Sequence, residues 1–131
     1  MMTPRRTTPR AVYRLNRSQL VNDSACLAQK FPKLKSLSVD LEYFDSRGVT
    51  KNGGMNFKAN IEHAKSLFCF NCVNGDCIGG DFDLSEELLS AVSGKRKLLK
   101  GEMRCLGARQ SKGADLGPCQ AILRYRLSLG Y

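Results

Sequence analysis

Four of the six cysteines fall beside turn-forming residues, where pairs of thiols can approach one another. Cys72 and Cys77 flank the segment VNGD, whose Asn-Gly pair permits a tight turn that would bring the two side chains together. Cys105 precedes Leu-Gly, and Cys119 follows Gly-Pro at the start of an alternating segment. Four thiolates in a tetrahedron are a usual coordination of structural Zn²⁺. The spacing C-x4-C followed by C-x13-C therefore predicts a four-cysteine zinc site made by Cys72, Cys77, Cys105 and Cys119.

The remaining cysteines and the single histidine are weaker candidates. Cys69 forms a C-x-x-C with Cys72, but residues three apart on a strand point to opposite faces. We therefore expect Cys69 to be a buried apolar residue and keep it as an alternative to Cys119 as a ligand. Cys26 is expected to be a core residue or a free thiol. His63 is expected to be structural, with ligation as the alternative, and simple burial of all the cysteines is the alternative to a metal site.

Thiol redox chemistry is a third interpretation of the cysteines. Reactive C-x-x-C motifs usually lie at a helix N-terminus, whose dipole stabilises the thiolate, whereas this one falls inside an expected strand. Hydrolytic chemistry has less support, because the chain has one histidine, and its evident carboxylate pair, Asp81 and Asp83, fits a turn and a helix cap. The sequence therefore predicts a protein that is not an enzyme.

Most of the scaffold that would position these residues shows the two-residue alternation of half-buried strands. The expected strands are 37–43, 55–61, 64–72, a short strand at about 103–105, and 119–131. The segments DSRG at 45–48 and KNGG at 51–54 predict the turn between the first two strands. The third strand is apolar on both faces and is therefore expected to be central in the sheet.

Helical signals are fewer than strand signals. The segment DLSEELLSAVSG at 83–94 predicts a helix capped by Asp83, with Glu86 completing a capping box and Gly94 ending the helix. A weaker helix is expected over 18–30. About five strands with hairpin-like connections and one well-capped helix predict an α+β domain, mainly an antiparallel sheet, that is stabilised by zinc.

Positive charge is concentrated in two parts of a chain whose formal net charge is +9. Residues 1–22 hold five arginines and no acid, which is typical of a phosphate-contacting arm or an organelle transit peptide. We expect residues 1–34 to be a basic N-terminal arm, partly disordered or weakly helical, and residues 35–131 to be the zinc-binding domain. A second basic run covers 95–112. The candidate nucleic-acid contacts are Arg5, Arg6, Arg10, Lys95, Arg96, Lys97 and Lys100.

The sequence thus predicts a small soluble binding module stabilised by structural zinc, with nucleic acid as the expected partner. A protein-interaction domain or a purely structural zinc domain is the alternative. No apolar run approaches the roughly 20 residues of a membrane span, and the N-terminus lacks the apolar segment of a secretory signal. We expect reduced cysteines and a cytoplasmic location, or an organelle if the arginine-rich start is a transit peptide.

Overall fold

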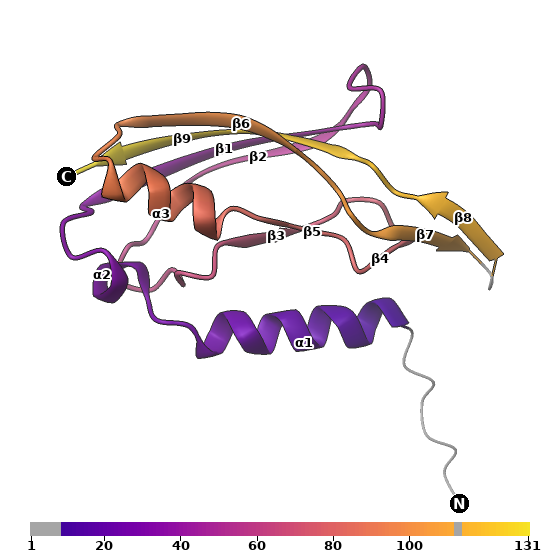
Figure 1. Ribbon diagram of the computed structural model, residues 1–131, viewed down its shortest axis with the longest axis horizontal. Helices are drawn as coiled ribbons and strands as arrows, with labels where there is room; N and C mark the ends of the chain where they lie inside the picture. Colours follow the sequence, from indigo (N-terminus) through magenta and orange to yellow (C-terminus); the bar gives the residue numbers. More distant parts are fainter. Residues whose placement is uncertain (1–8, 112–113) are drawn as a thin grey trace, which may run out of the picture.

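One antiparallel sheet dominates the computed structural model, which describes residues 9–111 and 114–131 (Figure 1). The strands of this main sheet lie in the order β2-β1-β9-β6. They are β1 (Ser36–Phe44), β2 (Lys51–Ala59), β6 (Leu98–Arg104) and β9 (Ile122–Gly130). The first and the last strand of the chain are therefore neighbours at the centre of the sheet. The α+β class predicted from the sequence is confirmed.

The apolar face of the main sheet follows from the alternation in β1 and β9. The register places Leu41 opposite Tyr125 and Val39 opposite Leu127, and Leu127 also lies opposite Leu99 of β6. Because side chains alternate between the two faces of a strand, these residues lie on one side of the sheet. That side forms the core, and the other side is polar.

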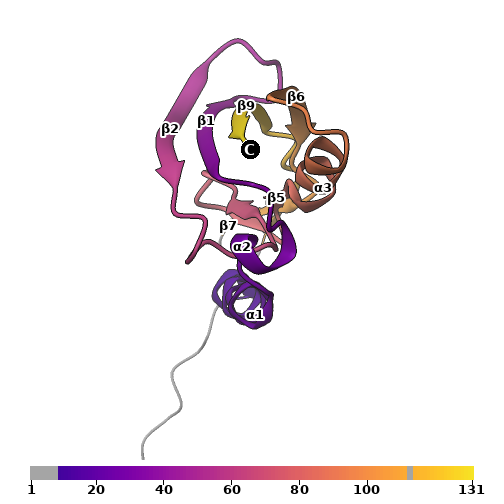
Figure 2. The same ribbon diagram turned by 90° about the vertical axis from the view of Figure 1, so that its left-hand side faces the viewer.

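Three helices accompany the main sheet. α3 (Ser85–Ser93) and the short α2 (Leu27–Lys30) lie on the side toward which the sheet curves, whereas α1 (Pro9–Asp23) lies farther out (Figures 1 and 2). Leu27 and Leu88 are completely buried, so α2 and α3 both contribute to the core.

Short strands make up the region around the cysteines. β3 (Cys69–Asn71) pairs with β5 (Asp81–Asp83). β4 (Cys77–Ile78) pairs with β7 (Ala108–Ser111), which pairs in turn with β8 (Ala114–Pro118). The β7-β8 ribbon lies at the end of the molecule opposite the C-terminus (Figure 1).

The helix expected over 83–94 is α3, and its start differs from the prediction. Asp83 Oδ1 accepts a hydrogen bond from the Ser85 amide at 2.9 Å, but Leu84 is the N-cap and its side chain makes no capping bond. The capping box expected with Glu86 is therefore wrong. Asp83, one residue before the N-cap, instead accepts the hydrogen bond of an amide in the first turn of the helix.

The single helix expected over 18–30 is also wrong. α1 ends at Asp23, and the Ser24 hydroxyl turns back to the last turn of the helix. Cys26 then forms an isolated antiparallel bridge with Lys65, which interrupts the helical path before α2 begins. A contact that is distant in sequence thus divides the predicted helix.

The turn expected at 45–48 is confirmed by a Gly48 amide to Asp45 carbonyl bond of 2.9 Å, whereas the segment 51–54 lies inside β2 and is not part of the turn. The expected central strand 64–72 is reduced to β3, which pairs with β5 outside the main sheet. The Ser66 amide instead donates to the Ala25 carbonyl at 2.8 Å.

Candidate metal centre

The four cysteines assigned to the site by their spacing meet at one point. Cys72 directly follows β3, Cys77 opens β4, Cys105 follows β6, and Cys119 follows β8. All four are buried, and their Sγ atoms lie within 4.8 Å of one another. The structure therefore brings two thiols of the short-stranded region together with two thiols at the base of the β7-β8 ribbon.

Distances between the sulfur atoms fit a tetrahedral metal site. Cys72 Sγ and Cys119 Sγ are 3.7 Å apart, and Cys77 Sγ and Cys105 Sγ are 3.5 Å apart. In a tetrahedron with Zn–S bonds of about 2.3 Å, the sulfur atoms are about 3.8 Å from one another. No disulfide joins any of the six cysteines. The cluster can therefore hold a metal ion.

Hydrogen-bond donors also point at the sulfur atoms. The Cys77 amide donates to the Asn74 carbonyl at 3.2 Å, which closes the turn that the Asn-Gly pair predicted. Asn74 Nδ2 donates to Cys119 Sγ at 3.1 Å, and the Gly107 amide donates to Cys105 Sγ at 3.4 Å. Donors of this kind stabilise negative charge, so they favour the thiolate forms that a metal requires.

Two glycines make room for the sulfur cluster. A Cβ atom at Gly80 would collide with the sulfur atoms of Cys77 and Cys105. A Cβ atom at Gly107 would lie 2.5 Å from Cys77 Sγ and 2.7 Å from the Gly80 backbone. No side chain fits at either position unless the cluster moves. The sequence prediction missed both residues, although each lies within three residues of a predicted ligand.

The surroundings raise the pKa values of two thiols of the cluster, Cys72 and Cys77. The hydrogen bond with Cys105, followed by burial, raises the pKa of Cys72 far above its ordinary value. Burial raises the pKa of Cys77 to about 12. A metal ion must therefore displace protons from the cluster when it binds, because only thiolates act as ligands.

Cys69 lies outside the cluster and faces α1. Its Sγ atom accepts a hydrogen bond from Arg17 Nη2 at 3.5 Å, and the residue is only partly buried. Burial, followed by the negative charge of Asp83, raises the pKa of Cys69 to about 12. The expectation of a purely apolar environment for Cys69 is therefore wrong. His63 is exposed after β2, and Cys26 is partly buried beside α2.

Two arginines attach α1 to the short-stranded region. Arg17 Nε donates to Asp81 Oδ2 at 2.6 Å, and Arg14 Nη2 donates to the Cys72 carbonyl at 3.3 Å. Their i, i+3 spacing, which places side chains on one helix face, was the available signal. The sequence prediction had assigned Asp81 to a turn and had counted both arginines as part of a basic arm.

The candidate nucleic-acid contacts that the structure describes belong to separate elements. Arg5 and Arg6 lie outside the described residues, and Arg10 belongs to α1. The exposed run 95–97 lies on the connection between α3 and β6. The division of the chain at residue 34 stays a prediction, although Leu34 and other residues before it belong to the core.

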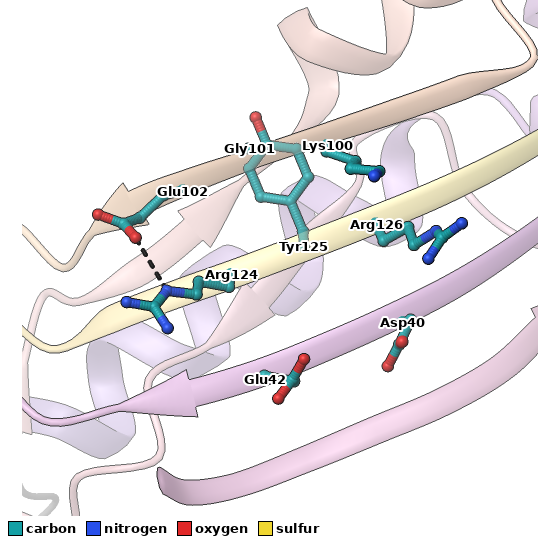
Figure 3. Close-up of a pocket in the computed structure, with 8 residues that line it drawn as sticks. All are labelled: Asp40, Glu42, Lys100, Gly101, Glu102, Arg124, Tyr125 and Arg126. Atoms are coloured by element: carbon teal, nitrogen blue, oxygen red, sulfur yellow. Dashed lines mark hydrogen bonds and ion pairs between the residues drawn. The ribbon is translucent and has the colours of Figure 1, made fainter. Parts of the chain in front are cut away.

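Lys100 lies apart from that run, on the polar face of the main sheet. There it lines a shallow pocket of about 340 Å³ whose lining contains both acidic and basic side chains (Figure 3). Arg124 Nε donates to Glu102 Oε2 at 3.0 Å in the same pocket. The other charged residues lining it are Asp40, Glu42 and Arg126. With three acids and three bases, the charges that line this pocket balance.

Comparison with known proteins gives no match: no family model, no curated protein and no solved structure matches this chain. Among the described residues, no helix has the length and apolar character needed to cross a membrane.

Proposed function

We propose that Cys72, Cys77, Cys105 and Cys119 bind one structural Zn²⁺ ion, and that the domain stabilised in this way is a nucleic-acid-binding module. The observation that carries the proposal is the group of four buried sulfur atoms at tetrahedral spacing. Four thiolates complete the coordination of zinc and leave no open position for a substrate, which favours a structural role. Iron accepts the same ligands, so metal analysis must identify the ion.

The proposed ion would hold together segments that bury little apolar surface themselves. Every described residue of β7 is exposed, and β8 is exposed except at the partly buried Gly117. Cys105 and Cys119 lie together at the base of this ribbon, before β7 and after β8, while Cys72 and Cys77 belong to the region that contacts α1. The metal would thus fix the ribbon and the short strands to β6 and β9 of the main sheet.

Net charge supports nucleic acid as the partner. The chain has 21 basic and 12 acidic residues, and the connection 95–97 is exposed. Such an excess attracts phosphate backbones and predicts binding that weakens steeply with salt. Arg14 and Arg17 are engaged within the molecule, so we assign binding to the basic residues outside that pair.

Exposed leucines favour a second candidate, a protein-interaction domain. Leu106 is 93% exposed directly beside Cys105, and Leu116 of the same ribbon is 49% exposed. Apolar side chains at an exposed ribbon are suited to contact with another protein. A thiol oxidoreductase is third, because raised pKa values at Cys69 and Cys77 work against reactive thiolates, and we propose no catalytic role.

Metal analysis of protein purified without added metal tests the site. We expect one zinc per chain, which is lost when Ser replaces Cys72, Cys77, Cys105 or Cys119 in turn. Cys69→Ser and Cys26→Ser are matched controls and should keep the metal, because both thiols lie outside the cluster. Metal-free wild-type protein, or a Cys69 variant that loses metal while a Cys119 variant keeps it, would contradict the assignment.

A further inference from the structure

The C-terminus lies at the end of the molecule opposite the β7-β8 ribbon (Figure 1). This end carries an apolar groove. It has a volume of about 240 Å³ and lies between the α2-β1 connection, the end of α3 and the C-terminal Tyr131. Phe31, Val92 and Tyr131 contribute its apolar and aromatic lining. Tyr131 is 40% exposed, and its hydroxyl donates to the Arg96 carbonyl at 2.8 Å, which fixes the ring in place.

Three lysines, Lys30, Lys33 and Lys95, also line the groove. All three are exposed, and none forms an ion pair with another described residue. The segments that build this end, 24–39, 88–101 and 127–131, contain no Asp or Glu. One acid, Glu62, belongs to the neighbouring turn that bonds to α2. The groove is therefore apolar inside and strongly positive around its edge.

The backbone at Lys95 is in an unfavourable conformation. The Lys95 amide bonds to the Val92 carbonyl at 3.0 Å, and the Arg96 amide bonds to the Ala91 carbonyl at 2.9 Å. This pattern is a Schellman motif, which favours glycine at its left-handed position. Here Lys95 has φ 50°, while Gly94 lies one residue too early. A strained residue that places a cation at a groove indicates a functional site rather than an optimised helix end.

From these three observations we infer that the groove binds single-stranded nucleic acid, with backbone phosphates on Lys30, Lys33 and Lys95 and a base stacked on Tyr131. The inference rests on the proposed nucleic-acid-binding function and identifies the surface responsible. Single strands offer unpaired bases to aromatic and apolar surfaces together with phosphates to cations. A duplex keeps its bases stacked inside, so it could use the lysines but not the apolar lining.

Binding of short fluorescein-labelled oligo(dT) and oligo(rU), measured by fluorescence anisotropy at several salt concentrations, tests the groove. Lys33→Gln with Lys95→Gln should reduce the slope of log affinity against log salt by about 1.4, since each lost phosphate contact accounts for about 0.7. The matched control neutralises Lys51 and Lys58 on β2, outside the groove, and should keep the affinity for the single strand within about threefold of wild type.

Tyr131 separates stacking from charge. Tyr131→Leu should weaken binding about 5- to 150-fold, the usual contribution of one stacked base. Tyr131→Phe keeps the ring and should bind close to wild type. Equal losses in the two variants would show that the hydroxyl, and not the ring face, matters, and this would overturn the stacking assignment.

Lys95→Gly gives a test in which stability and binding change in opposite directions. Glycine relieves the left-handed strain, so the Tm should rise by a few degrees while affinity falls. A Lys95→Gly variant that is more stable and binds as well as wild type would overturn the role of Lys95.

The outcomes distinguish the groove from the broader proposal. If the wild-type protein binds single strands and the groove variants match the β2 control, the groove is wrong and the nucleic-acid module stands. If the wild-type protein binds neither the single strands nor a duplex of the same length at low salt, both fail. Preference for a duplex of the same length, or for anionic lipid vesicles, would also overturn the single-strand inference.

Discussion

The main sheet and the short-stranded region around the cysteines contain very different amounts of buried apolar surface. In β9, five of nine residues are buried, including Leu123, Leu127 and Leu129, whereas no residue of β7 is buried. The sheet forms a core of ordinary type, while the other region surrounds four thiols. The hydrophobic effect therefore stabilises the main sheet, whereas the short-stranded region would depend on the proposed metal site.

Chain length gives a reason why a bound ion would add to the stability that the core supplies. A 131-residue chain buries somewhat less than about 70% of its unfolded surface, so one core cannot extend through every segment. A structural zinc site contributes roughly 10 to 16 kcal/mol of apparent folding free energy, as much as the total stability of about 5 to 15 kcal/mol of a domain. The proposed ion can therefore order strands that bury almost nothing.

Removing the metal should have the largest effect. A strong chelator, or Cys105→Ser, should unfold the short-stranded region, because the loss of about 10 kcal/mol or more exceeds what its few buried residues provide. Hydrogen exchange should show protection lost in β3, β4, β7 and β8 and retained in part by β1 and β9. Cys26→Ser is the control. Uniform protection after metal removal would mean that the two regions do not differ in this way.

A core truncation should damage the main sheet instead. Leu127 is completely buried opposite Val39 and Leu99, so Leu127→Ala should lower the free energy of unfolding by about 2 to 5 kcal/mol in urea denaturation. Leu98→Ala, at a residue that is 41% exposed, should change it by less than about 1 kcal/mol. Metal content should stay the same in both variants, and metal loss from the folded Leu127→Ala protein would contradict the separation.

Crowding the sulfur cluster should have an intermediate effect. Gly107→Ala forces a methyl group against Cys77 Sγ and the Gly80 backbone, so we expect a loss of about 1 to 3 kcal/mol together with weaker metal affinity in a chelator competition. Gly53→Ala has no neighbour within 4 Å and should leave metal affinity unchanged. Unchanged metal affinity in the Gly107 variant would show that the cluster tolerates displacement.

The ion pair between α1 and β5 should contribute least. Arg17 and Asp81 are 26% and 13% exposed, so Arg17→Ala should cost about 1 kcal/mol and increase exchange in α1. Arg124→Ala removes a pair whose side chains are 47% and 48% exposed, and it should cost about 0.5 kcal/mol or less. If both variants lose the same stability in thermal denaturation, the Arg17 pair is no more than a surface contact.

The parts of the fold that the sequence predicted well share one property. The strands at 37–43 and 119–131 show unbroken alternation, and their apolar phases meet in the register of β1 and β9. Cys72 and Cys77 were paired through the turn between them, which is also local. Their convergence with Cys105 and Cys119 was predicted from turn positions and the ligand number of zinc.

Several of the failed predictions concern segments whose hydrogen-bond partners are distant in sequence. Apolar residues on both faces of 64–72 indicated a central strand, but Phe68 packs against Phe70 in the core under the sheet. The arginines of α1 resembled a solvated arm because Asp81 lies 64 residues away from Arg17. A local pattern carries no information on such partners.

The sequence by itself determined which residues alternate and where turns are possible, because both depend on a few neighbouring side chains. The ligand number of zinc then grouped the four thiols that lie beside turns. Only the tertiary structure decided that β9 lies between β1 and β6, that Gly80 and Gly107 make room for the sulfur atoms, and that lysines from two connections surround one groove at Tyr131. The physical reason is that these features depend on which distant segments pack against one another. Local alternation shows which residues of a segment are buried, but it does not show which segment covers them.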